Sequence, residues 1–211
     1  RQADFDGAHQ AARAAVKLVD DNPLFAVGDK NSIRMNLAAF EVYHGGDHAV
    51  AEQQISVLIN EQQDENGLGG RMGTALNLLA EIAADRGDYT DAEAKLREAV
   101  EIEGRFFGEG SFSQTVSKVA LAEVLCRADK VDAATLIFEK MEQAAEQDGK
   151  DAYRHPRIIA ARAYYLAHAE SLETASDYLA EKGFTRSLAS RSLVGTFLVR
   201  RLSNLGVVIG D

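Results

Sequence analysis

The sequence is poor in residues that break helices or cross-link a chain. It has 2 prolines in 211 residues, 1 cysteine and no tryptophan. So few prolines leave room for long uninterrupted helices. A single cysteine excludes an internal disulfide and a multi-cysteine metal site. It also fits a reducing compartment, so we expect a cytoplasmic protein.

The chain also lacks long apolar runs and an excess of positive charge. No stretch of about 18 apolar residues occurs, so we expect no membrane span and no membrane partner. Acidic residues outnumber basic ones, 33 to 23, and the formal net charge is −10. An acidic surface repels phosphate backbones, which argues against direct nucleic-acid binding. The exception is residues 182–202, which carry five basic side chains and no acidic one.

An alanine recurs along the chain at a nearly constant interval. The five positions, at spacings of 43, 41, 42 and 41 residues, are Ala8, Ala51, Ala92, Ala134 and Ala175. Four residues after them stand Ala12, Ile55, Leu96, Phe138 and Leu179, and twelve before the last four stand Ala39, Ala80, Ala122 and Ala163. Small residues let helices approach closely, and larger apolar ones fill the space beside them. The pattern predicts a repeated structural unit.

Each unit is interpreted as two antiparallel helices, A followed by B. We expect A helices at 32–43, 72–85, 114–127 and 157–169, and B helices at 49–60, 90–103, 132–147 and 172–182. Gly45-Gly46 and Gly87-Asp88 are typical of tight turns between A and B, because glycine tolerates left-handed backbone. Asp88 or Thr90 is placed to cap the second B helix. Polar or glycine-rich linkers between units are expected at 63–70, 104–112 and 147–156.

One unit carries a specific resemblance. Residues 78–102, LLAEIAADRGDYTDAEAKLREAVEI, resemble a tetratricopeptide (TPR) repeat. The matching large, small, glycine and aromatic positions are Leu79, Ala80, Ala83, Gly87, Tyr89, Ala92, Leu96 and Ala99. The other units are degenerate, since Asp129 and Glu170 replace the turn glycine, and the period exceeds the 34 residues of a plain TPR.

The order of units also resembles the helical repeat region of MalT-type (LuxR-family) transcriptional regulators. The segments that carry this resemblance are 70–96, 120–147 and 155–183. In that family the region lies between a nucleotide-binding oligomerisation domain and a helix-turn-helix, and it senses an inducer or a partner protein. Neither flanking domain is expected here, because no GxxxxGK[ST] loop occurs and residues 184–211 do not fit a helix-turn-helix. The first residue is Arg1 rather than Met, so we expect part of a larger protein.

The fold prediction is all-α, a TPR-like α–α superhelix in a single domain over residues 1–211. Its units run approximately over 1–30 (partial), 31–68, 69–112, 113–154 and 155–183, and 184–211 is a capping segment. A solenoid needs such a cap. The apolar residues expected to cover the last pair are Leu188, Leu193, Val194, Phe197, Leu198 and Leu202. Arg200 and Arg201 are expected on its outer face, and the alternative is a basic docking surface.

A ligand of such a superhelix is expected on the concave groove that the A helices line. The candidate ligand- or partner-binding residues are Asn36, Phe40, Tyr43, Asn77, Glu81, Glu123, Arg127, Tyr164 and His168. Amides can bond a peptide backbone, and aromatic rings supply apolar contact area. We predict a groove that is acidic in the middle and aromatic at both ends; the alternative is a solvated face without a ligand. Glu81 and Glu123 would repel a C-terminal carboxylate.

No residues form a convincing catalytic or metal-binding set, and we expect no cofactor. His44 and His48 have the spacing of HExxH zinc motifs, but Gly45-Gly46 between them predicts a surface turn. The glycine-rich segment 67–73 departs from GxGxxG and is interpreted as an inter-repeat linker. Cys126 is expected to face the groove beside Arg127, which could lower its pKa. Without a nearby histidine, it is interpreted as a spectator thiol.

These observations predict a non-enzymatic interaction module. It would be the sensor or scaffold region of a larger LuxR-family regulator, binding a protein, a peptide or a small-molecule inducer in its groove. Homo-oligomers are also expected, because exposed superhelix ends can stack. Two alternatives stay open at this point: a stand-alone TPR scaffold that assembles a complex, and an accessory domain of an enzyme.

Overall fold

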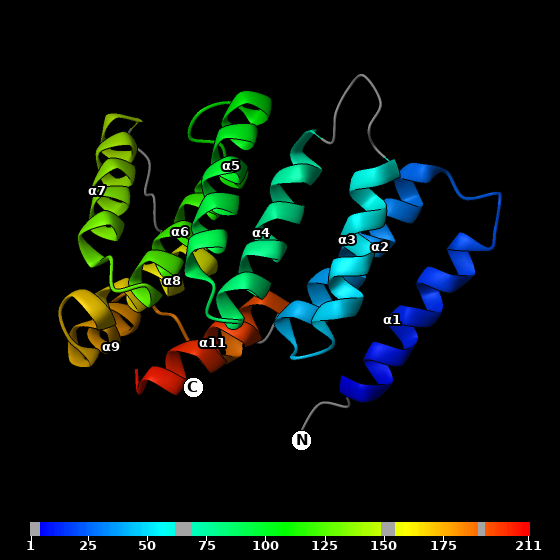
Figure 1. The fold of residues 1–211 in the computed structure, drawn as a ribbon. Helices are drawn as coiled ribbons and strands as arrows, with labels where there is room; N and C mark the ends of the chain where they lie inside the picture. The colour runs from blue at the N-terminus through cyan, green and yellow to red at the C-terminus, as the bar shows by residue number, and fades with distance from the viewer. Residues whose placement is uncertain (1–4, 62–68, 149–154, 190–192) are drawn as a thin grey trace.

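The computed structural model describes residues 5–61, 69–148, 155–189 and 193–211. Within these residues the chain is all-helical, apart from loops and an isolated β-bridge between Thr185 and Gly210. The helices are α1 Phe5–Asp20, α2 Val27–Tyr43, α3 His48–Glu61, α4 Gly69–Asp85, α5 Tyr89–Phe107, α6 Phe112–Arg127, α7 Val131–Asp148, α8 Pro156–Ala169, α9 Leu172–Glu181, α10 Arg186–Ala189 and α11 Leu193–Leu205 (Figure 1). The all-α prediction is confirmed for the described residues.

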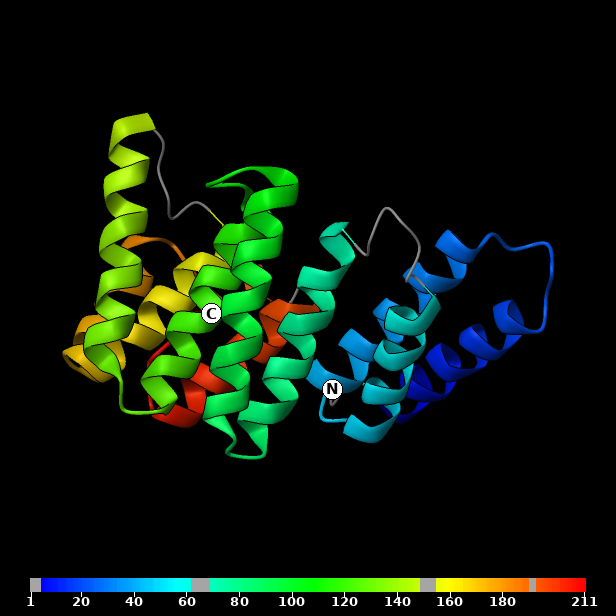
Figure 2. The same cartoon turned by 45° about the horizontal axis from the view of Figure 1, so that its top comes forward.

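The helices form two layers in chain order. Helices α2, α4, α6 and α8 each contact the next one in this series, and we call them the A layer. Helices α3, α5, α7 and α9 each pack against the A-layer helix that precedes them, and we call them the B layer. Helix α1 packs against α2, at the end of the row opposite to α8. Figures 1 and 2 show this row from two directions, with α11 packed against α8 and α2.

The expected helices are present close to their expected bounds. The four A helices lie inside α2, α4, α6 and α8, and three of the four B helices lie inside α3, α5 and α7. The fourth ends one residue early, at Glu181. The linker prediction was less accurate, because α4 already begins at Gly69 and α5 continues to Phe107. Residues 63–68 and 149–154 of the expected linkers lie outside the described residues.

The recurring alanine marks where the two layers press together. Four of its five members, Ala51, Ala92, Ala134 and Ala175, are completely buried. So are the larger residues Ile55, Leu96, Phe138 and Leu179 four positions later. Ala8 is the exception, because it is exposed on α1. Helix α1 instead buries Val16 and Val19, so the period alone did not indicate which of its faces is covered.

A buried glutamate adds polar contacts between α1 and α2. Glu41 is completely buried, and its carboxylate accepts a hydrogen bond of 2.8 Å from Arg13 Nε on α1 and another of 2.8 Å from the Asp47 backbone. His9 Nδ1 lies 3.0 Å from the same carboxylate. Burial raises the pKa of Glu41, but the bonds from Arg13 and Asp47 outweigh it and leave this pKa lowered. The carboxylate is therefore held ionised between the two helices and the turn that follows α2.

The turns have the backbone that the glycine pattern predicts. Gly45 and Gly87 have φ values of 71° and 82°. Asp129, which replaces the glycine in the next unit, also has a positive φ, of 57°. Asp88 caps α5, and its side chain accepts a hydrogen bond of 3.0 Å from the Asp91 backbone. The local turn chemistry thus separates the paired helices where the sequence places the breaks.

Gly73 provides a first test of the packing between the layers. A Cβ atom at this position in α4 would lie 2.4 Å from a carboxylate oxygen of buried Glu103 on α5. We therefore expect Gly73→Ala to lower the free energy of unfolding by about 1–3 kcal/mol, although alanine is the better helix former. Urea unfolding followed by circular dichroism measures the change.

The matched control is Gly28→Ala in α2. There the nearest atom, Arg71 Nη2, is 4.0 Å from the added Cβ. This variant is expected to be neutral or to gain up to about 1 kcal/mol. Equal effects of the two substitutions would contradict the close approach at Gly73.

Candidate partner-binding face

The A-layer helices present polar and aromatic residues toward α11. Helix α11 packs against α8 and α2, and its Arg201 side chain reaches residues of α4 and α6. All four A-layer helices therefore contribute to one contact with the C-terminal helix. We call the surface beneath α11 the A-layer face and define it by Tyr43, Glu81, Glu123, Arg127 and Tyr164.

Arg201 joins two carboxylates from different helices. Its Nη1 donates a hydrogen bond of 2.9 Å to Glu123 Oε2, and its Nη2 donates one to Glu81 Oε1. The side chains are 13% exposed at Arg201, 4% at Glu123 and 8% at Glu81, so all three are largely removed from water. Such charge-assisted bonds are strong because water competes little for the groups.

Two further arginines extend this network. Arg127 Nη1 lies 3.3 Å from Glu81 Oε1, and its Nη2 donates to the backbone oxygen of Ala84 at 2.7 Å and to Asp85 at 3.0 Å. Arg157 at the start of α8 makes a side-chain hydrogen bond with Tyr43 and is attracted by Glu123. The guanidinium groups thus link α2, α4, α6, α8 and α11.

The pKa shifts reveal the balance between burial and pairing. Burial raises the pKa of Glu123, and the charges of Arg201 and Arg157 oppose that rise without cancelling it. Burial lowers the pKa of Arg201, but Glu81 and Glu123 outweigh burial and leave this pKa raised. Arg201 therefore keeps its charge, whereas at Glu123 burial is the larger effect and its cationic neighbours only oppose it.

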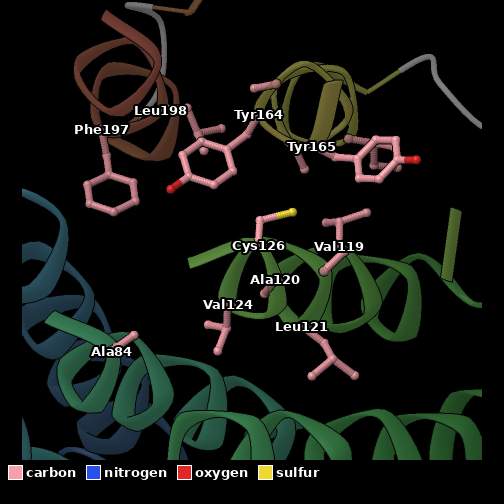
Figure 3. Packing of buried hydrophobic residues seen from close by; sticks show 14 of the residues in the cluster. Ala84, Val119, Ala120, Leu121, Val124, Cys126, Tyr164, Tyr165, Phe197 and Leu198 are labelled. Atoms are coloured by element: carbon pink, nitrogen blue, oxygen red, sulfur yellow. The ribbon is translucent and has the colours of Figure 1, made fainter. Parts of the chain in front are cut away.

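Aromatic rings surround the charged group. Phe197 of α11 lies with its ring centroid 5.1 Å from that of Tyr43, and the Arg201 guanidinium lies 4.4 Å from the Phe197 centroid and 6.0 Å from the Tyr164 centroid. Figure 3 shows Phe197 and Tyr164 extending into the same space between α11 and α8. Burial raises the pKa of Tyr164 to about 12, so its hydroxyl stays protonated. These rings add cation–π contact to the ion pairs.

The remaining candidate residues lie outside this central contact. Asn77 donates a hydrogen bond of 2.7 Å to Ser117, which in turn donates to buried Glu103. Phe40 packs between His9 and His44. His168 lies against the Tyr164 ring at a centroid distance of 4.6 Å, and Asn36 is exposed. Of the nine candidates, Tyr43, Glu81, Glu123 and Tyr164 therefore meet α11, and Arg127 joins them through Glu81. The other four lie outside this contact.

Helix α11 covers the acidic centre of the predicted groove, because Arg201 bonds Glu81 and Glu123 there. Two expectations for the cap were wrong. Arg201 was expected on the outer face of the cap, but it points into the A layer because only there do carboxylates compensate its charge. Leu188, expected to cover the last helix pair, is 37% exposed. The side chains of Leu193 and Val194 lie outside the described residues.

Sequence reasoning missed Arg201 and Phe197 as residues of the face. A signal was present, because Phe197, Leu198, Arg201 and Leu202 follow an i, i+1, i+4, i+5 pattern on one side of a helix. The predicted A-layer face also carried uncompensated glutamates. Matching a lone basic residue on an apolar helix side with these acids would have suggested the contact.

Cys126 also differs from its expected setting. It is 1% exposed, and burial raises the pKa of its thiol to about 12. Its neighbour Arg127 does not lower this pKa, because its guanidinium bonds Glu81 and Asp85 instead. Figure 3 shows Cys126 of α6 between α6 and α8, among buried residues. The expectation that Cys126 faces the groove was wrong, and the lowering of its pKa that Arg127 could have caused does not occur.

The histidine and glycine motifs are parts of the scaffold. Gly45 and Gly46 form the turn between α2 and α3, as predicted. Gly69–Gly73 begins α4 rather than forming a linker, while residues 67 and 68 lie outside the described part of the chain. In the described residues no group of three or more His, Cys, Asp or Glu side chains could hold a metal ion. None of the described helices is long and apolar enough to cross a membrane.

Comparison with protein-family models, with curated proteins and with solved structures finds no match to this chain. The functional argument therefore rests on the geometry of the A-layer face.

Arg201 allows a direct test of this geometry. Arg201→Ala would leave Glu81 and Glu123 buried beside one another with less cationic compensation. Breaking a buried pair in this way typically costs about 3–5 kcal/mol of stability. We expect a loss of this size in urea unfolding. The control is Arg97→Ala on α5, whose exposed pair with Glu93 should contribute at most about 0.5 kcal/mol. Comparable losses in both variants would contradict the buried network.

Proposed function

We propose that this chain is a non-enzymatic interaction module whose A-layer face binds a helical segment. The observation that carries the proposal is the pairing of Arg201 with Glu81 and Glu123. It supports the proposal because a surface built from several helices here already contacts another helix of the same chain through charge and aromatic rings. The buried Cys126 with its raised pKa is a poor nucleophile, which favours binding over covalent catalysis.

We further propose that the two layers form a TPR-like superhelix. The period of 41–43 residues, the four consecutive helix pairs and the buried alanines between the layers support this. In such an architecture each unit packs mainly on its neighbours, and extended faces are available to partners. The A-layer face would be the concave one.

The biological context that we propose is the sensor or scaffold region of a larger MalT-type LuxR-family regulator. The support is the resemblance of the repeat order over residues 70–183. Capture of a protein, peptide or inducer by the A-layer face would favour one conformation or oligomeric state, which attached domains would detect. The chain would act in the cytoplasm.

The reading frame that encodes this chain tests the regulator context. We expect it to encode a phosphate-binding loop upstream and a helix-turn-helix downstream of residues 1–211. A reading frame with neither would contradict the regulator proposal and leave the binding face unaffected.

Peptide binding tests the face itself. The probe is a fluorescent peptide of residues 193–208, LVGTFLVRRLSNLGVV, titrated into the full chain up to about 1 mM and followed by anisotropy. We expect weak but saturable binding, because the peptide competes with the tethered α11. In an Arg201→Glu chain, where α11 should no longer compete, Glu123→Gln should weaken probe binding at least tenfold, as expected for losing a charged hydrogen-bond acceptor. Binding that is indifferent to Glu123, or no binding at all, would contradict the proposal.

DNA binding is a separate test of the function class. The acidic chain, with a net charge of −10, should not shift duplex DNA in a gel at about 0.15 M salt. Of the basic residues at 182–202, Arg201 is engaged with Glu81 and Glu123, and Arg200 donates to the backbone oxygen of Tyr43, so neither is available to bind phosphate in this arrangement. A shift at submicromolar protein concentration would overturn the assignment of the chain as a module that does not bind nucleic acid.

A further inference from the structure

We propose that α11 is a built-in occupant of the A-layer face and that the external partner is an arginine-bearing amphipathic helix that replaces it. This rests on the proposed binding function and names the chemistry of the partner. The partner would carry an aromatic residue four positions before its arginine, as Phe197 precedes Arg201. The module would be closed when α11 is seated and open to the partner when α11 leaves.

The chemistry of the face selects arginine. Glu81 and Glu123 bond different Nη atoms of one guanidinium, so the acceptors match the planar fork of arginine. The same group lies over the rings of Phe197 and Tyr164. A lysine ammonium is a compact point charge that cannot reproduce both arrangements. A wholly apolar helix would remove the cation that joins the two buried carboxylates and leave only the compensation from Arg127 and Arg157, which is costly.

The side of α11 that faces the A layer defines the pattern the partner needs. Phe197, Leu198 and Leu202 are buried, and Arg201 is 13% exposed at its side chain. Asn204 is exposed, and Arg200, also exposed, donates a hydrogen bond of 3.3 Å to the backbone oxygen of Tyr43 at the end of α2. The recognition pattern is therefore aromatic, aliphatic, arginine and aliphatic at positions i, i+1, i+4 and i+5. This spacing places all four side chains along one helix side.

The position of α11 in the fold makes exchange feasible. The helix pairs α2–α3, α4–α5, α6–α7 and α8–α9 each pack internally, and the pairs contact one another through α4, α6 and α8. Helix α11 follows these pairs in the chain and is not a member of any of them. Replacing its arginine with another arginine leaves both carboxylates paired. The scaffold therefore retains its own packing and its compensated charges when one helix takes the place of the other.

The test compares peptide binding to a closed and an opened module. Arg201→Glu places a third carboxylate against Glu81 and Glu123, which should expel α11. Arg97→Glu makes the same change in net charge at an exposed position of α5. The probe is the fluorescent peptide of residues 193–208, and its matched control carries glutamate at the position of Arg201. Circular dichroism checks that each variant is folded.

We expect the Arg201→Glu chain to bind the probe at least tenfold more tightly than the wild-type and Arg97→Glu chains. The reason is that a tethered competitor acts at an effective concentration of about 1 mM. The control peptide should bind none of them. If Arg201→Glu does not fold, hydrogen exchange on the wild-type chain decides. Saturating probe should then speed exchange of the α11 amides and leave those of α5 unchanged.

The other outcomes separate this inference from the proposed function. Equal probe affinity for all chains, with weakening by Glu123→Gln, would show that the face binds helices without displacing α11, which overturns the inference alone. No binding to the folded Arg201→Glu chain would overturn both the inference and the proposed function. A wild-type chain that is dimeric by light scattering and does not bind the probe would assign the face to a second copy's α11, which overturns the external partner.

Discussion

The structure depends on one guanidinium group placed between two glutamates. Glu81 and Glu123 belong to consecutive A-layer helices, and stacking these helices brings both carboxylates into a region with little water. Two negative charges in that position are costly unless a cation joins them. Arg201 of α11, which lies 78 residues after Glu123 in the chain, supplies that cation. The closure of the C-terminal helix and the stability of the A layer are consequently coupled.

The two layers meet different physical requirements. Between the layers, alanines such as Ala92 and Ala134 are completely buried, and contact there depends on size. On the A-layer face, the contacts depend on charge and aromatic rings, as at Glu123 and Tyr164. Apolar packing tolerates many sequences, whereas paired buried charges require a matching partner. The apolar contacts between the layers therefore stabilise the row, whereas the charged and aromatic contacts on the face beneath α11 determine which helix can pack there.

The sequence contained most of the fold but only part of the site. Helix positions followed from local signals, such as the small residues at Ala80 and Ala92 and the turn at Gly87. The A-layer positions of Glu81 and Glu123 followed from the repeat period. The inward position of Arg201 did not, because no period relates it to the repeats. A contact between residues 81 and 201 is also not indicated by any pattern of neighbouring residues. The exposure of Ala8 shows the complementary error, in which a regular period suggested burial that packing does not provide.

A double-mutant cycle between Glu123 and Arg201 tests the central claim most directly. Unfolding free energies would be measured for the wild type, Glu123→Gln, Arg201→Met and the double variant. Direct pairing predicts a coupling energy of about 1–3 kcal/mol, because removing the second partner costs less once the first is gone, although Arg201 still bonds Glu81. Effects that add within about 0.5 kcal/mol would mean that the two side chains do not meet in solution, and the account of α11 as the occupant of the A-layer face would fail.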